Sequence, residues 1–198
     1  MLCSSTWLGN KSIYRTRMAI ADAGELIVLA PGVSQFGEDE EIDKLIRKHG
    51  YIGTPSIMKK MDEDKDLQQN LSAVAHLIHG SSEGRFSITY CPGHLTQEEV
   101  EGVGFKYANL KQMSKLYDVK NLKDGWNTVS NNGTDEDIYF ISNPALGLWA
   151  VEKRFEGSGE VKDTNRSGTS QQLYVEKLQH ASDNSGGVGG WKKPPQGS

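Results

Sequence analysis

A cysteine and a histidine lie three positions apart at Cys91 and His94, directly after an apolar run. Side chains of these types could supply a nucleophile with its base, or two ligands of a metal. The local pattern favours a structural interpretation, because residues 92–93 are a Pro-Gly turn signal and residues 96–99 read as a capping box. We therefore predict a buried strand, a turn and a capped helix here, with His94 on the loop as a ligand contact.

Two more histidines, His76 and His79, are spaced so that they share one face of a predicted helix, and together they could chelate a metal. No third ligand lies near them in the sequence, so we interpret them as helix-end contacts, with His76 towards the polar side. The glycine-bearing stretches 79–85 and 143–149 match neither phosphate-binding loop pattern. The sequence predicts no metal site and no catalytic residue of its own.

The densest polar stretch that follows a predicted strand end runs over residues 4–15. Asn10 and Tyr14 could line a cleft, and Arg15 could bind a carboxylate through two parallel hydrogen bonds. The alternative for this stretch is a capped helix start whose polar side chains are solvated.

Three apolar runs that each end in a turn signal must position these residues: 25–31, 85–93 and 137–147. Such runs are typical of strands buried on both faces, and we expect three neighbouring strands of a mostly parallel sheet. Helical patterns lie around and between them, at 12–23, 39–50, 63–79, 96–102 and 109–117. This alternation predicts an α/β fold, a three-layer Rossmann-like domain with helices on both faces of the sheet.

The two ends of the chain differ from this pattern. Residues 156–198 are rich in Gly, Ser, Asn, Lys and Gln, and we expect a mostly disordered C-terminal tail in which only 171–181 could form a helix. Residues 1–155 form the predicted domain. We expect its first strand to be truncated, because the chain begins on what reads as a strand end, and we expect Met1 to be an internal methionine of a longer protein.

Composition narrows the function classes. The chain has 198 residues, 36% of them hydrophobic, and a formal charge of -4, which suits one soluble domain with a real core. No stripe of Lys and Arg could follow a phosphate backbone, so nucleic acid is not an expected partner. No apolar stretch approaches the roughly 20 residues that span a bilayer, and no signal peptide pattern is present. We expect a cytoplasmic protein without a membrane partner.

The order of these elements resembles the C-terminal domain of the lactate racemase family, the nickel-pincer-nucleotide enzymes. In that family a strand leads to a loop with a D-x-N-x-Y-Q-like signature, then to a helix and a G-G-x-I-V-L-x-A strand. Residues 23–30 match that strand, and four residues stand in the loop positions: Asn10, Ser12, Tyr14 and Arg15. The resemblance covers residues 1–150 and none of the tail.

The resemblance implies a racemase or epimerase, an isomerase that acts on a 2-hydroxy acid or related compound by hydride transfer to the cofactor and back. The family keeps its nickel ligand, its cofactor-bearing lysine and its proton-transferring histidines in an N-terminal domain that is absent here. The expected role is therefore a cleft-closing fragment, inactive and without bound cofactor by itself, with that missing domain and a hydroxy-acid-like substrate as partners. Its nearest contact positions are Gln69, Ser72 and Trp126.

A stand-alone α/β module is the alternative, one that binds a small ligand or a protein partner through the loops at its strand ends. Such a module would melt cooperatively and bind its ligand alone. A cysteine enzyme that uses Cys91 is a third interpretation, and replacement of Cys91 by alanine would test it.

Overall fold

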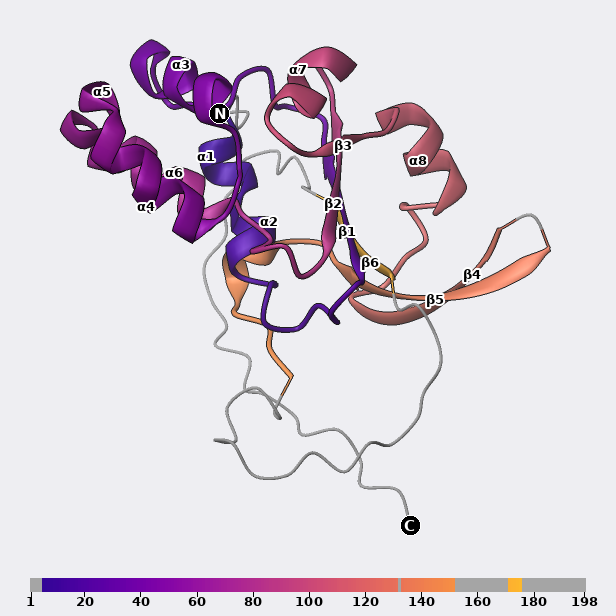
Figure 1. Ribbon diagram of the computed structural model, residues 1–198. Helices are drawn as coiled ribbons and strands as arrows, with labels where there is room; N and C mark the ends of the chain where they lie inside the picture. The colour runs from indigo at the N-terminus through magenta and orange to yellow at the C-terminus, as the bar shows by residue number, and fades with distance from the viewer. Residues whose placement is uncertain (1–4, 132, 152–170, 176–198) are drawn as a thin grey trace, which may run out of the picture.

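The computed structural model describes residues 5–131, 133–151 and 171–175 of the chain. A six-stranded sheet with the order β3-β2-β1-β6-β5-β4 runs through the molecule (Figure 1). Its strands are β1 (Glu25–Ala30), β2 (Ser87–Pro92), β3 (Lys106–Tyr107), β4 (Gly125–Asn131), β5 (Thr134–Ile141) and β6 (Gln171–Val175). All neighbouring strands are parallel except β4, which is antiparallel to β5 and lies at one edge.

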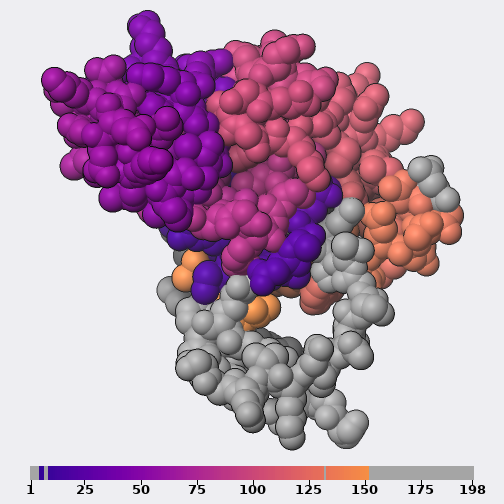
Figure 2. All heavy atoms as spheres, in the orientation of Figure 1, coloured from indigo at the N-terminus to yellow at the C-terminus, as the bar shows by residue number. Residues whose placement is uncertain are grey.

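Helices cover both faces of the sheet (Figure 1). They are α1 (Thr6–Gly9), α2 (Lys11–Tyr14), α3 (Glu40–His49), α4 (Thr54–Glu63), α5 (Lys65–Gln69), α6 (Leu71–His79), α7 (Gln97–Gly102), α8 (Leu110–Leu116) and the 3-10 helix η1 (Pro144–Leu146). The helices α3 to α6 form one lobe, coloured violet to purple, beside the pink residues of α7 and α8 in the space-filling view (Figure 2). The fold is therefore α/β, with a mostly parallel sheet between helical layers.

Strand β1 is buried on both faces, which explains its continuous apolar sequence. Leu26, Val28 and Ala30 belong to the core cluster shared with α2, α3 and α6, whereas Ile27 and Leu29 belong to a second cluster on the opposite face. Successive side chains of a strand point to opposite faces, so a strand covered on both sides is apolar at every position.

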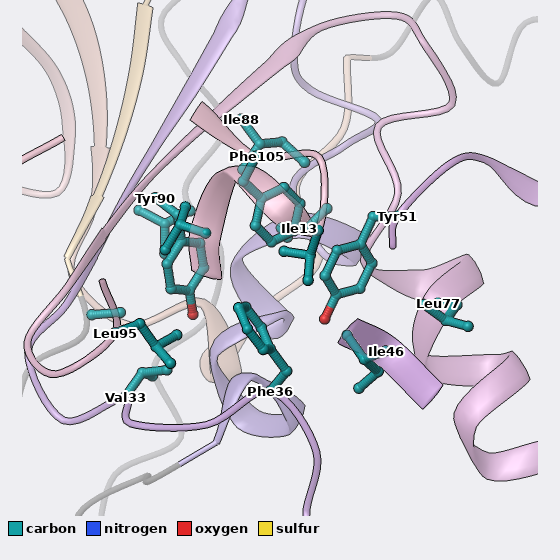
Figure 3. Packing of buried hydrophobic residues seen from close by; sticks show 14 of the residues in the cluster. Ile13, Val33, Phe36, Ile46, Tyr51, Leu77, Ile88, Tyr90, Leu95 and Phe105 are labelled. Atoms are coloured by element: carbon teal, nitrogen blue, oxygen red, sulfur yellow. The ribbon is translucent and has the colours of Figure 1, made fainter. Parts of the chain in front are cut away.

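Several aromatic rings pack among the aliphatic side chains of the larger cluster (Figure 3). The ring of Phe105 stacks on Tyr51 with centroids 4.5 Å apart, and on Tyr90 at 5.5 Å. Such pairs contribute about 0.5–1.5 kcal/mol each beyond the area that they bury. They join the loop after α3 to strand β2, and so connect the helical lobe to the sheet.

Two predicted helices are confirmed with their ends. Helix α3 has Asp39 as its N-cap, whose Oδ1 accepts a hydrogen bond from Ile42 N at 2.8 Å. Helix α7 has the predicted capping box, in which Glu99 N donates to Thr96 Oγ1 (3.3 Å) and Thr96 N donates to Glu99 Oε2 (2.7 Å). These ends depend on side chains within four residues, which is why the sequence pattern reveals them.

Other helices differ from the prediction. The expected helix over 12–23 ends at Tyr14, and turns follow it. The guanidinium of Arg85 donates to the carbonyls of Arg17 and Ile20, which satisfies this non-helical backbone from another segment. Helix 63–79 is interrupted at Asn70, whose side chain accepts from Ala73 N at 3.0 Å and caps α6. Helix α4 before it was missed.

The apolar spacing of residues 63–79 predicts a buried stripe that includes Leu67, Leu71 and Leu77. For Leu71 this prediction is wrong, because its exposed fraction is 66%. The interruption at Asn70 changes the direction in which the first turn of α6 faces. Leu67 and Leu77 are fully buried, whereas Ile78 is partly buried.

The sheet also has strands that the sequence pattern did not reveal. The three predicted strands are present as β1, β2 and β5, but β6 separates β1 from β5, so the three are not all neighbours. Residues 171–175 form this strand and not the start of a helix. They lie between β1 and β5 and gain backbone hydrogen bonds from both. The edge strand β4 was also missed. The rest of the predicted tail and the predicted strand end at residues 1–4 lie outside the described residues.

Candidate functional site

Four polar side chains meet inside the molecule and form what we call the polar cluster: Thr6, Asn10, Tyr51 and His76. Their exposed fractions are 0%, 1%, 8% and 4%. The imidazole Nε2 of His76 lies 3.0 Å from Thr6 Oγ1, 3.2 Å from Asn10 Nδ2 and 3.0 Å from Tyr51 Oη. The cluster therefore joins the N-terminal helices, the loop after α3 and helix α6.

One arrangement of the hydrogen bonds in the polar cluster fits a neutral His76. The hydroxyl of Thr6 donates to Phe36 O at 2.6 Å, and Asn10 Nδ2 donates to Tyr51 Oη at 3.2 Å. The Tyr51 hydroxyl is then free to donate to His76 Nε2, which accepts only when the imidazole carries its proton on Nδ1. Asn10 Nδ2 lies 3.2 Å from the same nitrogen and is also a donor, so this arrangement gives the neutral imidazole two donors.

Burial also keeps both titrating groups of the polar cluster uncharged at neutral pH. It lowers the pKa of His76 to about 4, with the nearby His79 as a second cause. Burial likewise raises the pKa of Tyr51 well above its usual value. Both shifts disfavour the charged form, as expected for groups removed from water. A general acid or base at neutral pH needs a pKa near that pH, so we interpret the polar cluster as structural.

Gly80 is what lets the polar cluster close. A Cβ atom at this position would lie 2.3 Å from Tyr51 Cε1 and 2.5 Å from Asn10 Nδ2, closer than non-bonded atoms approach. Asn10 Oδ1 is the one side-chain atom of the cluster that is buried without a hydrogen-bond partner in the described part of the chain. Asn10 was a predicted contact residue. No local sequence pattern pointed to Thr6, Tyr51 or Gly80.

A more accessible group, which we call the polar rim, lies next to the cluster: Tyr14, Arg15 and His79. The ring centroids of Tyr14 and His79 are 5.4 Å apart, and Arg15 Cζ lies 5.7 Å from the Tyr14 ring. Arg15 Nη1 donates to the carbonyls of Ala145 (3.1 Å) and Gly147 (3.2 Å). The rim thus combines helices α2 and α6 with the η1 segment.

The three side chains of the polar rim are hydrogen-bond donors, and none of them is a carboxylate. In the ranges that the structure covers, Arg15 forms no ion pair, and its Nη2 is not used by η1. A guanidinium, a phenol and an imidazole can all donate to a carboxylate. The structure therefore brings two of the predicted residues, Tyr14 and Arg15, together with His79 at the rim, whereas Asn10 lies with His76 in the buried polar cluster.

The four remaining predicted contacts do not join the rim. Gln69 ends α5 and Ser72 lies in the first turn of α6, both exposed, and Ser72 precedes His79 by about 10 Å along the helix. His94 is exposed on the loop after β2. Trp126 lies on the edge strand β4, away from α5 and α6 (Figure 1), and is 65% exposed. These positions share no common site because their elements lie on different parts of the fold.

Cys91 is a buried side chain of β2, packed with Ile27 and Leu29. Burial raises the pKa of its thiol to about 12, and the carboxylate of Glu25 adds to the shift. A thiol that stays protonated is a poor nucleophile and a poor metal ligand. The predicted structural role of this segment is confirmed.

His76 was expected near the polar side of its helix, and this is wrong, because the side chain turns inward to the polar cluster. The side chain faces Thr6 and Asn10. Neither the helical period nor the adjacent residues in the sequence indicate these contacts. Within residues 5–131, 133–151 and 171–175, no three His, Cys, Asp or Glu side chains are placed to hold a metal ion.

No described helix has the length and apolar character needed to cross a membrane; the longest, α3 and α4, have ten residues each.

Comparison with known proteins adds little. No protein family and no curated protein matches the chain. A solved structure of a Thermotoga maritima protein is similar, with a TM-score of 0.48 and 20% sequence identity over 57% of this chain. The chain covers 29% of that protein's length, so it is much shorter than this neighbour. Similarity of this degree carries no argument about function.

Proposed function

We propose that the chain is the cleft-closing domain of a racemase or epimerase similar to the lactate racemases, acting on a 2-hydroxy acid or related compound as part of a longer enzyme. The observation that carries the proposal is the polar rim. Tyr14 and Arg15 are positions of the loop signature on which the resemblance depends, and they lie beside His79 at one accessible place. Residues 25–30 of the matching apolar segment form β1, behind this loop.

The rim would bind the carboxylate of the substrate. Arg15 has donors that η1 leaves unused, and the Tyr14 hydroxyl and the His79 imidazole lie next to it. Charge-assisted hydrogen bonds of this kind are about twice as strong as neutral ones and fix orientation. Closure of the domain would also remove water from the substrate.

The nickel-pincer nucleotide belongs to the partner domain in this proposal. The described residues do not fit a metal, because no set of three ligating side chains converges. The residues of this chain would orient the substrate and exclude water, and they would transfer neither hydride nor proton. A cytoplasmic location is part of the proposal, and the free thiol of the buried Cys91 is in keeping with it.

The proposal is tested by titrating lactate into the ¹⁵N-labelled chain and following backbone amide shifts. We expect saturable shifts at Tyr14, Arg15 and His79. Lactamide has the same shape without the negative charge, and should cause at least about tenfold weaker effects because it lacks the charge-assisted contact. Equal responses to lactate and lactamide, or no saturable shift at the rim, would contradict substrate binding by this surface.

A matched pair of variants sharpens this test. Arg15→Gln removes the guanidinium from the rim, whereas Lys11→Gln removes a positive charge from helix α2, of which Arg15 is the C-cap. We expect lactate binding to be lost in the first and kept in the second. Thermal melts of both variants would show that the η1 contacts of Arg15 are not needed for folding, so that loss of binding reports the rim.

A further inference from the structure

A cavity of about 300 Å³ opens at the carboxyl end of β5 and has no part in the proposed function. We call it the β5 cavity. Its lining includes Asp124, Tyr139, Ile141, Ser142, Leu146 and Trp149. Carboxyl ends of parallel strands are where open α/β sheets place ligands, and the volume is at the lower end of small-molecule sites.

One negative charge stands in the β5 cavity. Asp124 Oδ1 accepts a hydrogen bond from Ser142 N (2.6 Å), and its Oδ2 accepts from Ser142 Oγ (2.8 Å). These two bonds fix the carboxylate but leave its charge in place. Among the described residues, no basic side chain lines the cavity or forms an ion pair with Asp124.

Aromatic and aliphatic side chains supply the rest of the cavity. Tyr139 and Trp149 both line it and both pack against the main core cluster. Trp126 supports Tyr139 edge-to-face, with centroids 5.3 Å apart. Gly147 lies against the indole, since a Cβ there would come within 3.0 Å of the Trp149 ring. The rings are therefore held in place before any ligand arrives.

Arg15 lies near this region, because its Nη1 donates to the carbonyls of Ala145 and Gly147. Its guanidinium also lies against the Tyr14 ring. It does not line the cavity. Among the described residues that line the cavity, the charged side chain is thus that of Asp124.

From this combination we propose that the β5 cavity binds a free small molecule through an organic ammonium group, such as a quaternary or methylated amine. Aromatic faces attract such cations, and a weakly hydrated ammonium can enter an apolar pocket that a hydrated metal ion would not. Asp124 is exposed, so its carboxylate attracts a cation and repels an anion, whereas a neutral ligand gains no favourable interaction with its charge. The cavity is therefore a second site, with a charge preference opposite to that of the rim.

Calorimetric titration of the whole chain with choline tests the proposal. The neutral isostere 3,3-dimethylbutan-1-ol has the same shape, with carbon in place of nitrogen. We expect saturable binding of choline, and at least about tenfold weaker binding of the isostere because it lacks the charge. Equal binding of the two, or no saturable heat from choline, would overturn the proposal.

Variants locate the binding. Asp124→Asn should weaken choline about tenfold, and Trp149→Phe should weaken it about threefold, because indole is the best of the aromatic partners for a cation. Asp62→Asn, which removes the same charge from an exposed position of α4, should leave the affinity unchanged. Circular dichroism would show that each variant is folded. Unchanged choline affinity in folded Asp124→Asn would place the binding elsewhere and overturn the assignment.

A peptide that carries trimethyllysine distinguishes the two sources of such a group. We expect it to bind no more tightly than choline, since the ammonium head is the recognised part. Binding more than about tenfold tighter than choline would overturn the small-molecule assignment, because it would mean that the surface around the cavity contacts a peptide chain.

Discussion

The polar cluster and the β5 cavity both combine aromatic rings with polar groups, but they differ in how those groups are satisfied. In the polar cluster, Thr6, Asn10, Tyr51 and His76 are buried and satisfy one another, apart from one amide oxygen. In the β5 cavity, Asp124 is fixed by Ser142, and no basic side chain in the described part of the chain forms an ion pair with it. Groups that pair with one another stabilise the fold, whereas a charge left open in a cavity is available to a ligand.

The largest expected effect breaks the polar cluster by overpacking. Gly80→Ala places a Cβ atom 2.3 Å from the Tyr51 ring, and we expect a loss of about 3 kcal/mol or more in the free energy of unfolding. Urea denaturation measures this loss. Gly102→Ala is the control, because its Cβ would meet nothing within 4 Å, and it should leave stability unchanged or raise it slightly. Equal effects in the two variants would show that the cluster is not tightly packed.

Acid should weaken the polar cluster through His76. Its pKa is about 4 in the folded chain, against an ordinary value of 6.5 for a solvated imidazole, so below pH 6.5 the unfolded chain binds the proton first. The contribution is complete above pH 6.5 and is lost as the pH falls towards 4, by up to about 3 kcal/mol. Denaturation series at several pH values measure it.

His76→Gln is the comparison for this pH series. The variant cannot titrate at this position, so its stability should change less between pH 6.5 and 4 than that of the unaltered chain, even if it is less stable throughout. If both proteins lose the same stability over this interval, His76 is not held neutral in the fold.

Removing one hydroxyl should have a smaller effect. Tyr51→Phe keeps the ring stack on Phe105 but removes the hydroxyl that accepts from Asn10 Nδ2 and contacts His76 Nε2. Removal of one partner from a buried hydrogen-bond network costs about 1–3 kcal/mol. Tyr107→Phe, on the short strand β3, should change stability by less than about 0.5 kcal/mol. Thermal unfolding of the two variants compares them, and a neutral Tyr51→Phe would mean that water or another group satisfies the amide.

The smallest stability effect is expected in the β5 cavity. Asp124→Asn keeps an oxygen that can accept from Ser142, so we expect less than about 1 kcal/mol of destabilisation. Ligand binding should respond far more than stability does, in contrast to the polar cluster. A loss as large as that of Gly80→Ala would show that Asp124 supports the fold, and the distinction between the two regions would fail.

Local pattern by itself determined several features of this protein. The apolar runs of β1 and β2 and the caps of α3 and α7 follow from residues close together in the chain. Hydrogen bonds of a cap and the alternation of a strand are short-range, so the sequence carries them directly.

Tertiary structure alone decided the site. His76 is buried because Thr6, 70 residues away, faces it, and residues 171–175 are a strand because β1 and β5 pair with them. Asn10 is an internal amide of the polar cluster and not a cleft residue, whereas Tyr14, one turn further along the chain, reaches the rim. Whether a polar side chain is buried or exposed depends on which distant segment packs over it, and no local pattern contains that information.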